Sequence, residues 1–197
     1  DDLRECLQSL AKQTHASLEV IVVDNASVDD SAAMVRSEFP SVVLLSETRN
    51  HGFPEACNIG IEASHGEWVC MLNNDTVADE RWAQALVEVA RDADDRCGML
   101  QSLMLYKSRP DVVNSTGINL TTRGSGRDRL DGKPRADATA AAEIFCPTAG
   151  AAAYRRTMLE ELKTPDGYFD RRHFLYYEDL DLGWRARLAG WSAAFVP

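Results

Sequence analysis

Residues 67–76 read Glu67-Trp68-Val69-Cys70-Met71-Leu72-Asn73-Asn74-Asp75-Thr76, a run of five apolar side chains that ends directly in three polar ones. The apolar run is too short for a helix and predicts a strand buried on both faces. Ligands bind outside the carboxyl ends of strands in open α/β sheets, so the polar residues are well placed for a site. The same residue types also form turns and cap helices, which leaves both interpretations open for this segment alone.

Strand-like and helical patterns alternate on both sides of this segment. Continuous apolar runs predict further strands at 20–23 and 42–45. Apolar periodicity and end signals predict helices at 3–10, 31–39, 54–63 and 80–91. Such alternation is typical of a mainly parallel sheet with helices on both faces. The predicted fold class is therefore α/β, with a Rossmann-like sheet.

The second half of the sequence is less regular. We expect strands at 98–106 and 193–196, and a helix from 178 to about 189. Residues 144–154 are mostly small and apolar and include Gly150. Residues 121–142 are rich in Gly, Arg, Asp and Ala and have no apolar period. This stretch predicts a long, partly mobile loop, and loops of that length inside compact domains are usually functional or disordered.

Composition excludes several classes of protein. The chain has 197 residues, a length that favours one domain, and a formal net charge of −10 from 31 acidic and 21 basic residues. That charge argues against a general nucleic-acid binder. No apolar run approaches the roughly 20 residues of a membrane span, and no signal peptide is evident. Five scattered cysteines without a C-x-x-C pair predict reduced, buried thiols in a cytosolic protein.

Acidic residues follow strand-like runs at three places: Asp24, Asp75 and the group Glu178, Asp179 and Asp181. Acids at helix starts are favoured by the helix dipole even without a ligand, so each place has a structural alternative. Three such places in one α/β domain favour a site assembled from distant loops. No G-x-G-x-x-G, phosphate-loop or G-x-S-x-G motif offers a different chemistry.

The same places carry an ordered resemblance to family 2 glycosyltransferases. Val22-Val23-Asp24-Asn25-Ala26-Ser27-Val28-Asp29 resembles their first nucleotide-contacting loop, and Arg49-Asn50-His51-Gly52-Phe53, with Ala56, Asn58 and Gly60, looks like their second donor loop. Leu72-Asn73-Asn74-Asp75 is similar to the D-x-D segment in an N-N-D form. Gly150, Arg155-Arg156 and Gly167-Tyr168-Phe169-Asp170 resemble the acceptor side. Tyr177-Glu178-Asp179-Leu180-Asp181-Leu182, followed by Arg185 and Gly190, is similar to the E-D signature.

The resemblance implies a GT-A fold and an inverting sugar transfer from a nucleotide-diphosphate donor. It makes Asp179 the base, with Glu178 positioning the acceptor or raising the pKa of that base by like-charge proximity. It gives Asp75 the role of holding Mg²⁺ or Mn²⁺ against the diphosphate. The donor-binding residues implied are Asp24, Asn25, Ser27, Arg49, Asn50, Gly52, Asn58, Asn73, Asn74 and Asp75; those implied for the acceptor are Gly150, Tyr177 and Arg185.

Two departures from the family pattern affect what is expected. Asn73 stands where the first acid of D-x-D would be, so one anionic ligand is lost and metal affinity should be weaker. The N-N-D form resembles rhamnosyltransferase-like members, which points to dTDP-sugars such as dTDP-rhamnose, with UDP-sugars as the alternative. The acceptor expected is a hydroxyl of a saccharide or a lipid-linked molecule.

We expect one domain over 1–197, with a nucleotide-sugar-binding half at 1–96 and an acceptor-binding and catalytic half at 97–197. Family members begin with a strand before the first helix and carry a histidine beyond the last strand. Neither is found here, so we expect a domain cut at both ends, with an unpaired apolar edge on strand 20–23. The resemblance implies polysaccharide biosynthesis in the cytoplasm, with the inner face of the plasma membrane, reached through regions outside this chain, as an alternative location. Two rival functions stay open, a sugar-nucleotidyltransferase and a non-catalytic nucleotide-sugar-binding module.

Overall fold

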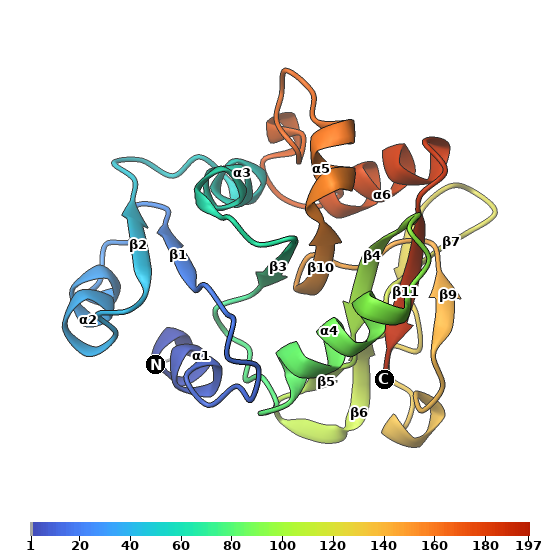
Figure 1. Ribbon diagram of the computed structural model, residues 1–197, viewed down its shortest axis with the longest axis horizontal. Helices are drawn as coiled ribbons and strands as arrows, with labels where there is room; N and C mark the ends of the chain where they lie inside the picture. The colour runs from blue at the N-terminus through green and yellow to red at the C-terminus, as the bar shows by residue number, and fades with distance from the viewer. Residues whose placement is uncertain (1) are drawn as a thin grey trace.

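The computed structural model describes residues 2–197 as an α/β domain with helices on both sides of its strands (Figure 1). In the N-terminal part, β1 (Ile21–Asp24) pairs in parallel with β2 (Val43–Ser46). Helices α1 (Asp2–Leu10) and α2 (Ser31–Glu38) pack on this pair through a small apolar cluster centred on Leu7, Met34 and Val35. The predicted strands and helices of this part are confirmed to within a few residues.

A five-stranded sheet forms the centre of the domain, in the order β3-β10-β4-β11-β9. Strand β10 runs antiparallel to both of its neighbours and β9 runs antiparallel to β11, so β4 with β11 is the parallel pair within it. The expectation of a mainly parallel sheet is therefore wrong for this part of the chain. The five strands are β3 (Trp68–Leu72), β4 (Cys97–Ser102), β9 (Ala142–Ile144), β10 (Ala151–Arg155) and β11 (Ser192–Val196).

The reason lies in how the chain enters β10. Ala151 at the start of β10 lies opposite Leu72 at the end of β3, so the chain enters this strand at the edge where the polar residues of the quoted segment lie. Because β10 lies between β3 and β4 and runs away from that edge, it is antiparallel to both of them.

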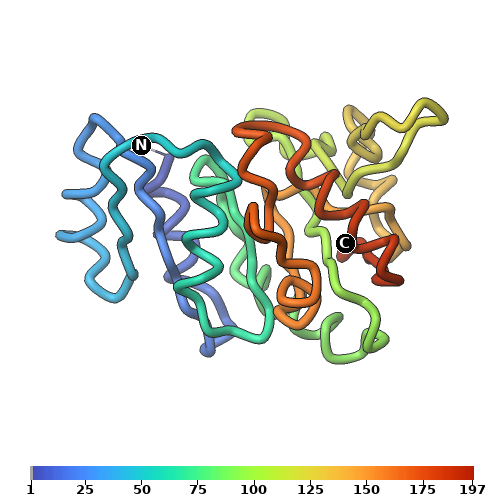
Figure 2. Tube along the Cα trace, turned by 90° about the horizontal axis from the view of Figure 1, so that it is seen from above, coloured from blue at the N-terminus to red at the C-terminus, as the bar shows by residue number. Residues whose placement is uncertain are grey.

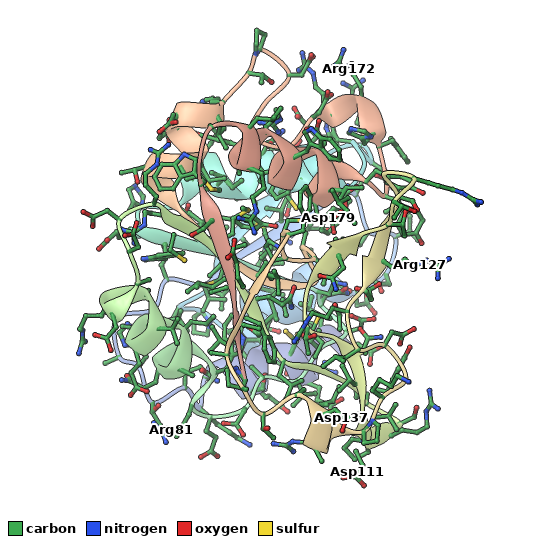
Figure 3. All side chains as sticks on the ribbon, turned by 90° about the vertical axis from the view of Figure 1, so that its right-hand side faces the viewer. Arg81, Asp111, Arg127, Asp137, Arg172 and Asp179 are labelled. Atoms are coloured by element: carbon green, nitrogen blue, oxygen red, sulfur yellow. The ribbon has the colours of Figure 1, made fainter. Side chains whose placement is uncertain are left out.

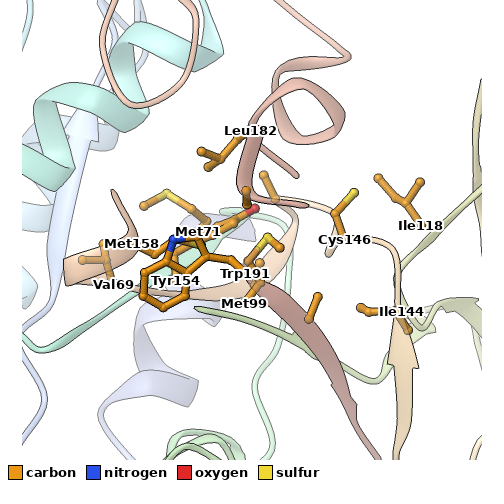
Figure 4. Close-up of a cluster of buried hydrophobic side chains, with 14 of the residues drawn as sticks. Val69, Met71, Met99, Ile118, Ile144, Cys146, Tyr154, Met158, Leu182 and Trp191 are labelled. Atoms are coloured by element: carbon orange, nitrogen blue, oxygen red, sulfur yellow. The ribbon is translucent and has the colours of Figure 1, made fainter. Parts of the chain in front are cut away.

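Helices cover both faces of the strands, as the sequence predicts. Figure 1 shows α3, α5 and α6 on one side and α1 and α4 on the other. Their side chains enclose a core in which Met99, Tyr154 and Leu182 are fully buried (Figure 4). Four of these helices are α3 (Phe53–Ala63), α4 (Trp82–Asp92), α5 (Arg156–Leu162) and α6 (Glu178–Leu188). No helix in the described part of the chain is long and apolar enough to cross a membrane.

Residues 121–142 contain regular structure where the sequence predicts a loop. Strand β8 (Gly126–Asp128) pairs with β7 (Ile118–Leu120), and a 3₁₀ turn covers Arg135–Asp137. The N–H of Arg129 also donates to the carbonyl of Gly117 at 2.7 Å. Backbone hydrogen bonds rather than apolar burial order this stretch, which explains why no apolar period announces it. The remaining elements are β5 (Met104–Tyr106), β6 (Arg109–Ser115) and the 3₁₀ turn Arg171–His173.

An open channel separates β1 from β3. Within residues 2–197, β1 pairs with β2 alone and β3 with β10 alone, so each leaves one edge free. A cavity of about 700 Å³ lies between them, and its walls include Val22, Val69 and Cys70. Figure 2 shows the chain from above, with the N-terminal part at the left and the C-terminal part at the right. The expected unpaired edge of the first strand is present, and it faces this cavity.

Cys70 corrects one detail of the quoted segment. The strand is buried through Val69 and Met71, whereas Cys70 is exposed to water in the channel rather than buried on a second apolar face. Protein atoms still surround its thiol closely, and this burial raises the pKa of Cys70 to about 12. No disulfide forms among the described cysteines, as expected, and Cys6, Cys97 and Cys146 are buried.

Candidate active site

The first donor loop begins where β1 ends. The carboxylate of Asp24 accepts a hydrogen bond from the N–H of Ser27 at 2.9 Å, which closes a tight turn around Ala26. Asn25 points across to the second loop: its Nδ2 donates to the Asn50 side-chain oxygen at 3.0 Å and to the Gly52 carbonyl at 3.1 Å. The two loops predicted to bind the donor are thus joined by the side chain of Asn25.

Gly52 links the second loop to the segment that precedes α6. Its φ is +83°, and a Cβ there would lie 2.6 Å from the carbonyl oxygen of Phe174, so only glycine fits. The N–H of the next residue, Phe53, donates to that same carbonyl at 2.9 Å. Loops about 120 positions apart in sequence therefore meet at this point, as is common for sites built on loops.

The Asn73-Asn74-Asp75 segment is held by its backbone, which leaves its side chains available. The N–H of Asn73 donates to the Gly150 carbonyl at 3.0 Å, and the Thr76 hydroxyl donates to the Asn73 carbonyl at 2.6 Å. The side chains of Asn74 and Asp75 are exposed at the cavity. No hydrogen bond or ion pair from residues 2–197 engages the Asp75 carboxylate.

A divalent metal fits this segment only with help from the substrate. The described residues contain no cluster of three or more His, Cys, Asp or Glu side chains that could hold a metal by themselves. Mg²⁺, however, is usually bound through one or two carboxylates together with substrate phosphates. An unpaired carboxylate at the mouth of a cavity matches that donor set, and Asn73 and Asn74 add neutral amide oxygens.

The acidic pair Glu178-Asp179 opens helix α6. Figure 3 shows Asp179 in the interior beside α6, whereas Arg127 and Arg172 project outward. The carboxylate of Asp179 accepts hydrogen bonds from the N–H of Leu180 at 2.7 Å and from the N–H of Ala149 at 3.3 Å. Glu178 is 5% exposed, and one of its oxygens, Oε2, has no partner among the described residues. Asp179 is therefore held in place, and Glu178 is largely removed from water.

Burial is the main cause of the unusual acidity of this pair. It raises the pKa of Asp179, while hydrogen bonds from Ala149, Leu180 and Thr148 partly lower it again. Burial also raises the pKa of Glu178, to which the charge of neighbouring Asp179 adds. We expected the charge of Glu178 to raise the pKa of Asp179. The main cause is instead the burial of Asp179 itself. The two groups are adjacent in sequence, so the charge of Asp179 opposes the ionisation of Glu178.

The two halves of the candidate site meet at the peptide that joins Ala149 to Gly150. The Gly150 carbonyl accepts from Asn73, and the Ala149 N–H donates to Asp179. A side chain at Gly150 would approach the Asn73 amide to 3.4 Å, so the absence of one leaves room beside it. One rigid strand start thus positions the proposed metal-binding segment and the proposed base relative to each other.

Gln101 and Thr148 support this junction and were not among the predicted residues. Gln101 is fully buried, and its Oε1 accepts from the Thr148 N–H at 2.7 Å while its Nε2 donates to the Ala151 carbonyl at 3.2 Å. The Thr148 side chain in turn bonds to Asp179. A glutamine inside the apolar run 99–103 was the available sequence signal, since buried amides need partners.

The cavity of about 700 Å³ gathers most of the residues predicted to bind the donor. Phe174 and Leu175 also line it, and the sequence did not single them out. The predicted donor residues that line it are Asp24, Asn25, Ser27, Asn50, Gly52, Asn73, Asn74 and Asp75. Arg49 is exposed and does not line it.

Asn58 and Arg185 hold the scaffold rather than face this cavity. Asn58 is 6% exposed; its Oδ1 accepts from the backbone N–H groups of Tyr168 and Phe169, and its Nδ2 donates to the Phe169 carbonyl. The Arg185 guanidinium donates to the Leu162 and Tyr168 carbonyls and to Asp181. The structure therefore does not support a donor-binding role for Asn58 or an acceptor-binding role for Arg185, because the polar groups of both side chains already bond to other residues of the chain. Tyr177, 62% exposed with φ +68°, remains free to meet an acceptor.

Comparisons of the sequence with known proteins point to one family. The family model described as glycosyl transferase family 2 matches residues 1–163. The N-acetylglucosaminyl-diphospho-decaprenol L-rhamnosyltransferase of Mycobacterium tuberculosis is 27% identical over 226 residues, which cover 99% of this chain and 69% of that protein. A shorter match, over 53% of this chain and 38% of the other protein, is 38% identical to an uncharacterized glycosyltransferase of Haemophilus influenzae.

Solved structures support the fold. GalNAc-T7, solved with UDP, GalNAc and Mn²⁺, superposes with a TM-score of 0.78 at 18% identity, over 100% of this chain and 40% of that one. This similarity shows that the domain has the GT-A fold. The domain is a transferase, and by sequence the chain belongs to glycosyl transferase family 2.

Proposed function

We propose that this domain transfers a sugar from a nucleoside-diphosphate donor to a hydroxyl group, with inversion at the anomeric carbon. The observation that supports this most is the Ala149-Gly150 peptide, which bonds to the N-N-D segment on one side and to Asp179 on the other. A single displacement needs a base for the incoming hydroxyl and a counter-charge for the departing diphosphate. This junction sets the two at a fixed separation.

The cavity at the ends of β1 and β3 is the proposed donor site. At about 700 Å³ it falls within the usual range of small-molecule sites, about 300–1,000 Å³. Asp24 would accept a hydrogen bond from the base of the nucleotide. The two loops that the Asn25 side chain joins would enclose that base. Asp75, with Asn73 and Asn74, would hold Mg²⁺ or Mn²⁺, and the metal would supply positive charge to the diphosphate.

Asp179 is the proposed base. Burial raises its pKa, and a base whose pKa lies closer to the working pH transfers protons more efficiently. The N–H groups of Ala149 and Leu180 keep its carboxylate in one orientation. Glu178, held beside it, would position the acceptor hydroxyl, and exposed Tyr177 would contact the acceptor sugar.

The donor and acceptor are proposed from the relatives. The mycobacterial protein is named as an L-rhamnosyltransferase that acts on a diphospho-decaprenol-linked sugar. We extend to this chain a dTDP- or UDP-sugar donor, with dTDP-rhamnose first, and a saccharide or lipid-linked acceptor. The location proposed is the cytoplasm or its membrane face.

The test is a screen of nucleotide sugars by thermal stabilisation, followed by transfer assays on the protein that contains this domain. A binding donor should raise the unfolding temperature in a concentration-dependent way. The anomeric configuration of the product, read by NMR, checks inversion. Binding without transfer or donor hydrolysis would favour a non-catalytic module, and release of pyrophosphate from a sugar phosphate and a nucleoside triphosphate would favour a nucleotidyltransferase.

Restoring the missing acid should strengthen the metal site. We expect Asn73→Asp to tighten Mn²⁺ binding, because a second carboxylate replaces a neutral amide. The gain should be about tenfold or more in the metal concentration that gives half-maximal donor binding. Val77→Asp adds the same charge at an exposed side chain two positions beyond Asp75, outside the cavity, and serves as the control. An equal gain in both variants would mean that general electrostatics, rather than coordination by residue 73, is responsible.

A further inference from the structure

Two buried polar atoms without partners lie in the neighbourhood of the proposed base. Within residues 2–197, the Tyr154 hydroxyl and the Glu178 Oε2 atom are buried and make no hydrogen bond. A phenol hydroxyl is a donor, and a carboxylate oxygen is an acceptor. Buried groups of this kind are rarely left unpaired, because each would lose its bonds to water without compensation. The two groups are chemically complementary.

Tyr154 packs in the core beside α6, the helix that opens with Glu178 and Asp179. Tyr154 lies on the central strand β10, opposite Val69 of β3 and Met99 of β4, and is fully buried. Figure 4 shows its ring beneath α6, next to Leu182. Phe169 holds the ring from the side, with ring centroids 5.6 Å apart in an edge-to-face arrangement. The ring therefore has little freedom to turn away from the helix that carries Glu178 and Asp179.

Among residues 2–197, no cationic side chain acts on this hydroxyl to favour the loss of its proton. Burial and the nearby carboxylates of Asp179 and Glu178 raise the pKa of Tyr154, so it stays a donor. The thiols of Cys57 on α3 and Cys146 before β10 are also kept protonated, since burial raises the pKa of each. The charged groups farther out are His173, which faces Glu178, Asp128, which faces Asp179, and Arg187, which faces Cys146.

We propose that the Tyr154 hydroxyl donates a hydrogen bond to the Glu178 carboxylate, directly or through one water molecule. Tyr154 is then a positioning residue: it fixes the orientation of Glu178 and stabilises the ionised form of the Glu178-Asp179 pair. This inference rests on the proposed function of that pair. It adds a role for a side chain that lies in the hydrophobic core and touches neither donor nor acceptor.

The test compares Tyr154→Phe with Tyr168→Phe. Both changes remove one hydroxyl from a buried ring, but the Tyr168 hydroxyl bonds to Glu160 and Lys163, away from the acidic pair. Loss of the donor to Glu178 raises the proton affinity of the pair, so Tyr154→Phe should move the acid limb of the pH–kcat profile upward by about one unit. It should also lower kcat with little change in the KM for the donor. Tyr168→Phe should leave the acid limb in place.

A second readout does not depend on turnover. In protein labelled with ¹³C at glutamate carboxyls, the Glu178 signal, assigned by its loss in Glu178→Gln, should titrate at higher pH in Tyr154→Phe than in the unchanged protein. The free energy of unfolding is a third readout. Removing an unpaired buried hydroxyl should leave this free energy unchanged or raise it, whereas removing a hydrogen-bonded hydroxyl should lower it. An unmoved Glu178 titration together with unchanged or raised stability would overturn the inference. If the unchanged protein transfers no sugar, the proposed function fails, and the Glu178 titration still decides the hydrogen bond.

Discussion

Asp179→Asn should lower turnover by about 10²–10⁴-fold, the usual contribution of a positioned general base. Asparagine keeps the shape of the side chain, and its one amide oxygen can still accept the hydrogen bond from Leu180, whereas the bond from Ala149, which reaches the other carboxylate oxygen, is lost. The shorter bond at the helix start should therefore be kept. Asparagine cannot accept the proton of the acceptor hydroxyl. Donor affinity should barely change, because Asp179 does not line the donor cavity. Transfer kinetics and donor calorimetry on the same preparation measure both quantities.

Asp181→Asn is the matched control for this variant. It removes the same charge two positions further along α6, where the carboxylate bonds to Arg185 at the surface side of the helix. We expect only a small effect on turnover there, because the Asp181 carboxylate bonds to Arg185 and does not line the cavity. Near-normal turnover in Asp179→Asn would instead transfer the base role to Glu178 or Asp181.

Stability should respond to Asp179→Asn in the opposite direction from activity. Burial raises the pKa of Asp179 above its unfolded value, so the folded protein binds the proton more tightly. The ionised carboxylate therefore costs stability once pH rises above the unfolded value of about 3.9, and the full cost is reached above the folded pKa. Asparagine carries no such cost. The variant should unfold at an equal or higher temperature near pH 7, as expected for a residue kept for function rather than stability.

The first half of the fold could be predicted from sequence because its signals are local. The apolar runs of β1, β2 and β3 and the periodicity of α3 and α4 each specify an element without reference to the rest of the chain. The direction of β10 could not be predicted this way. It is set by pairing with β3, more than 80 positions earlier, and no local pattern encodes that partner.

The same distinction separates the site residues. Asp24, Asp75 and Asp179 were predicted as site residues because carboxylates after strand-like runs match a chemistry as well as a family pattern. Asn58 and Arg185 were assigned to ligands, yet their groups are occupied by backbone atoms of Phe169 and Leu162. Gln101 was overlooked for the converse reason, because its role depends on Thr148, 47 positions away. The sequence shows which side chains have suitable chemistry, whereas the fold determines whether each polar group bonds to other residues or stays available to a ligand.

Asp75→Ala should abolish the metal-dependent part of donor binding and leave the fold intact. The carboxylate is exposed, bonds to no described residue, and is the one anionic side chain of the N-N-D segment. Removing it takes no volume from the core, so the unfolding temperature should change little. Donor affinity should fall to the level measured with a chelator, a loss of at least about 10- to 100-fold, the range seen for residues that only support a metal ligand.

The control for Asp75→Ala is Asp79→Ala, which removes an exposed acid four positions later. Within residues 2–197 the Asp79 carboxylate accepts a hydrogen bond from the N–H of Arg81 and from no other group, so this change tests the effect of local charge without the proposed coordination. Calorimetry with a nucleotide-sugar donor, with and without Mn²⁺, should show metal dependence in the unchanged protein and in Asp79→Ala but not in Asp75→Ala. If a chelator leaves donor binding and transfer untouched in the full-length enzyme, the metal role is wrong. The diphosphate would then have to be neutralised by cations outside the N-N-D segment, since its only acid would repel the donor.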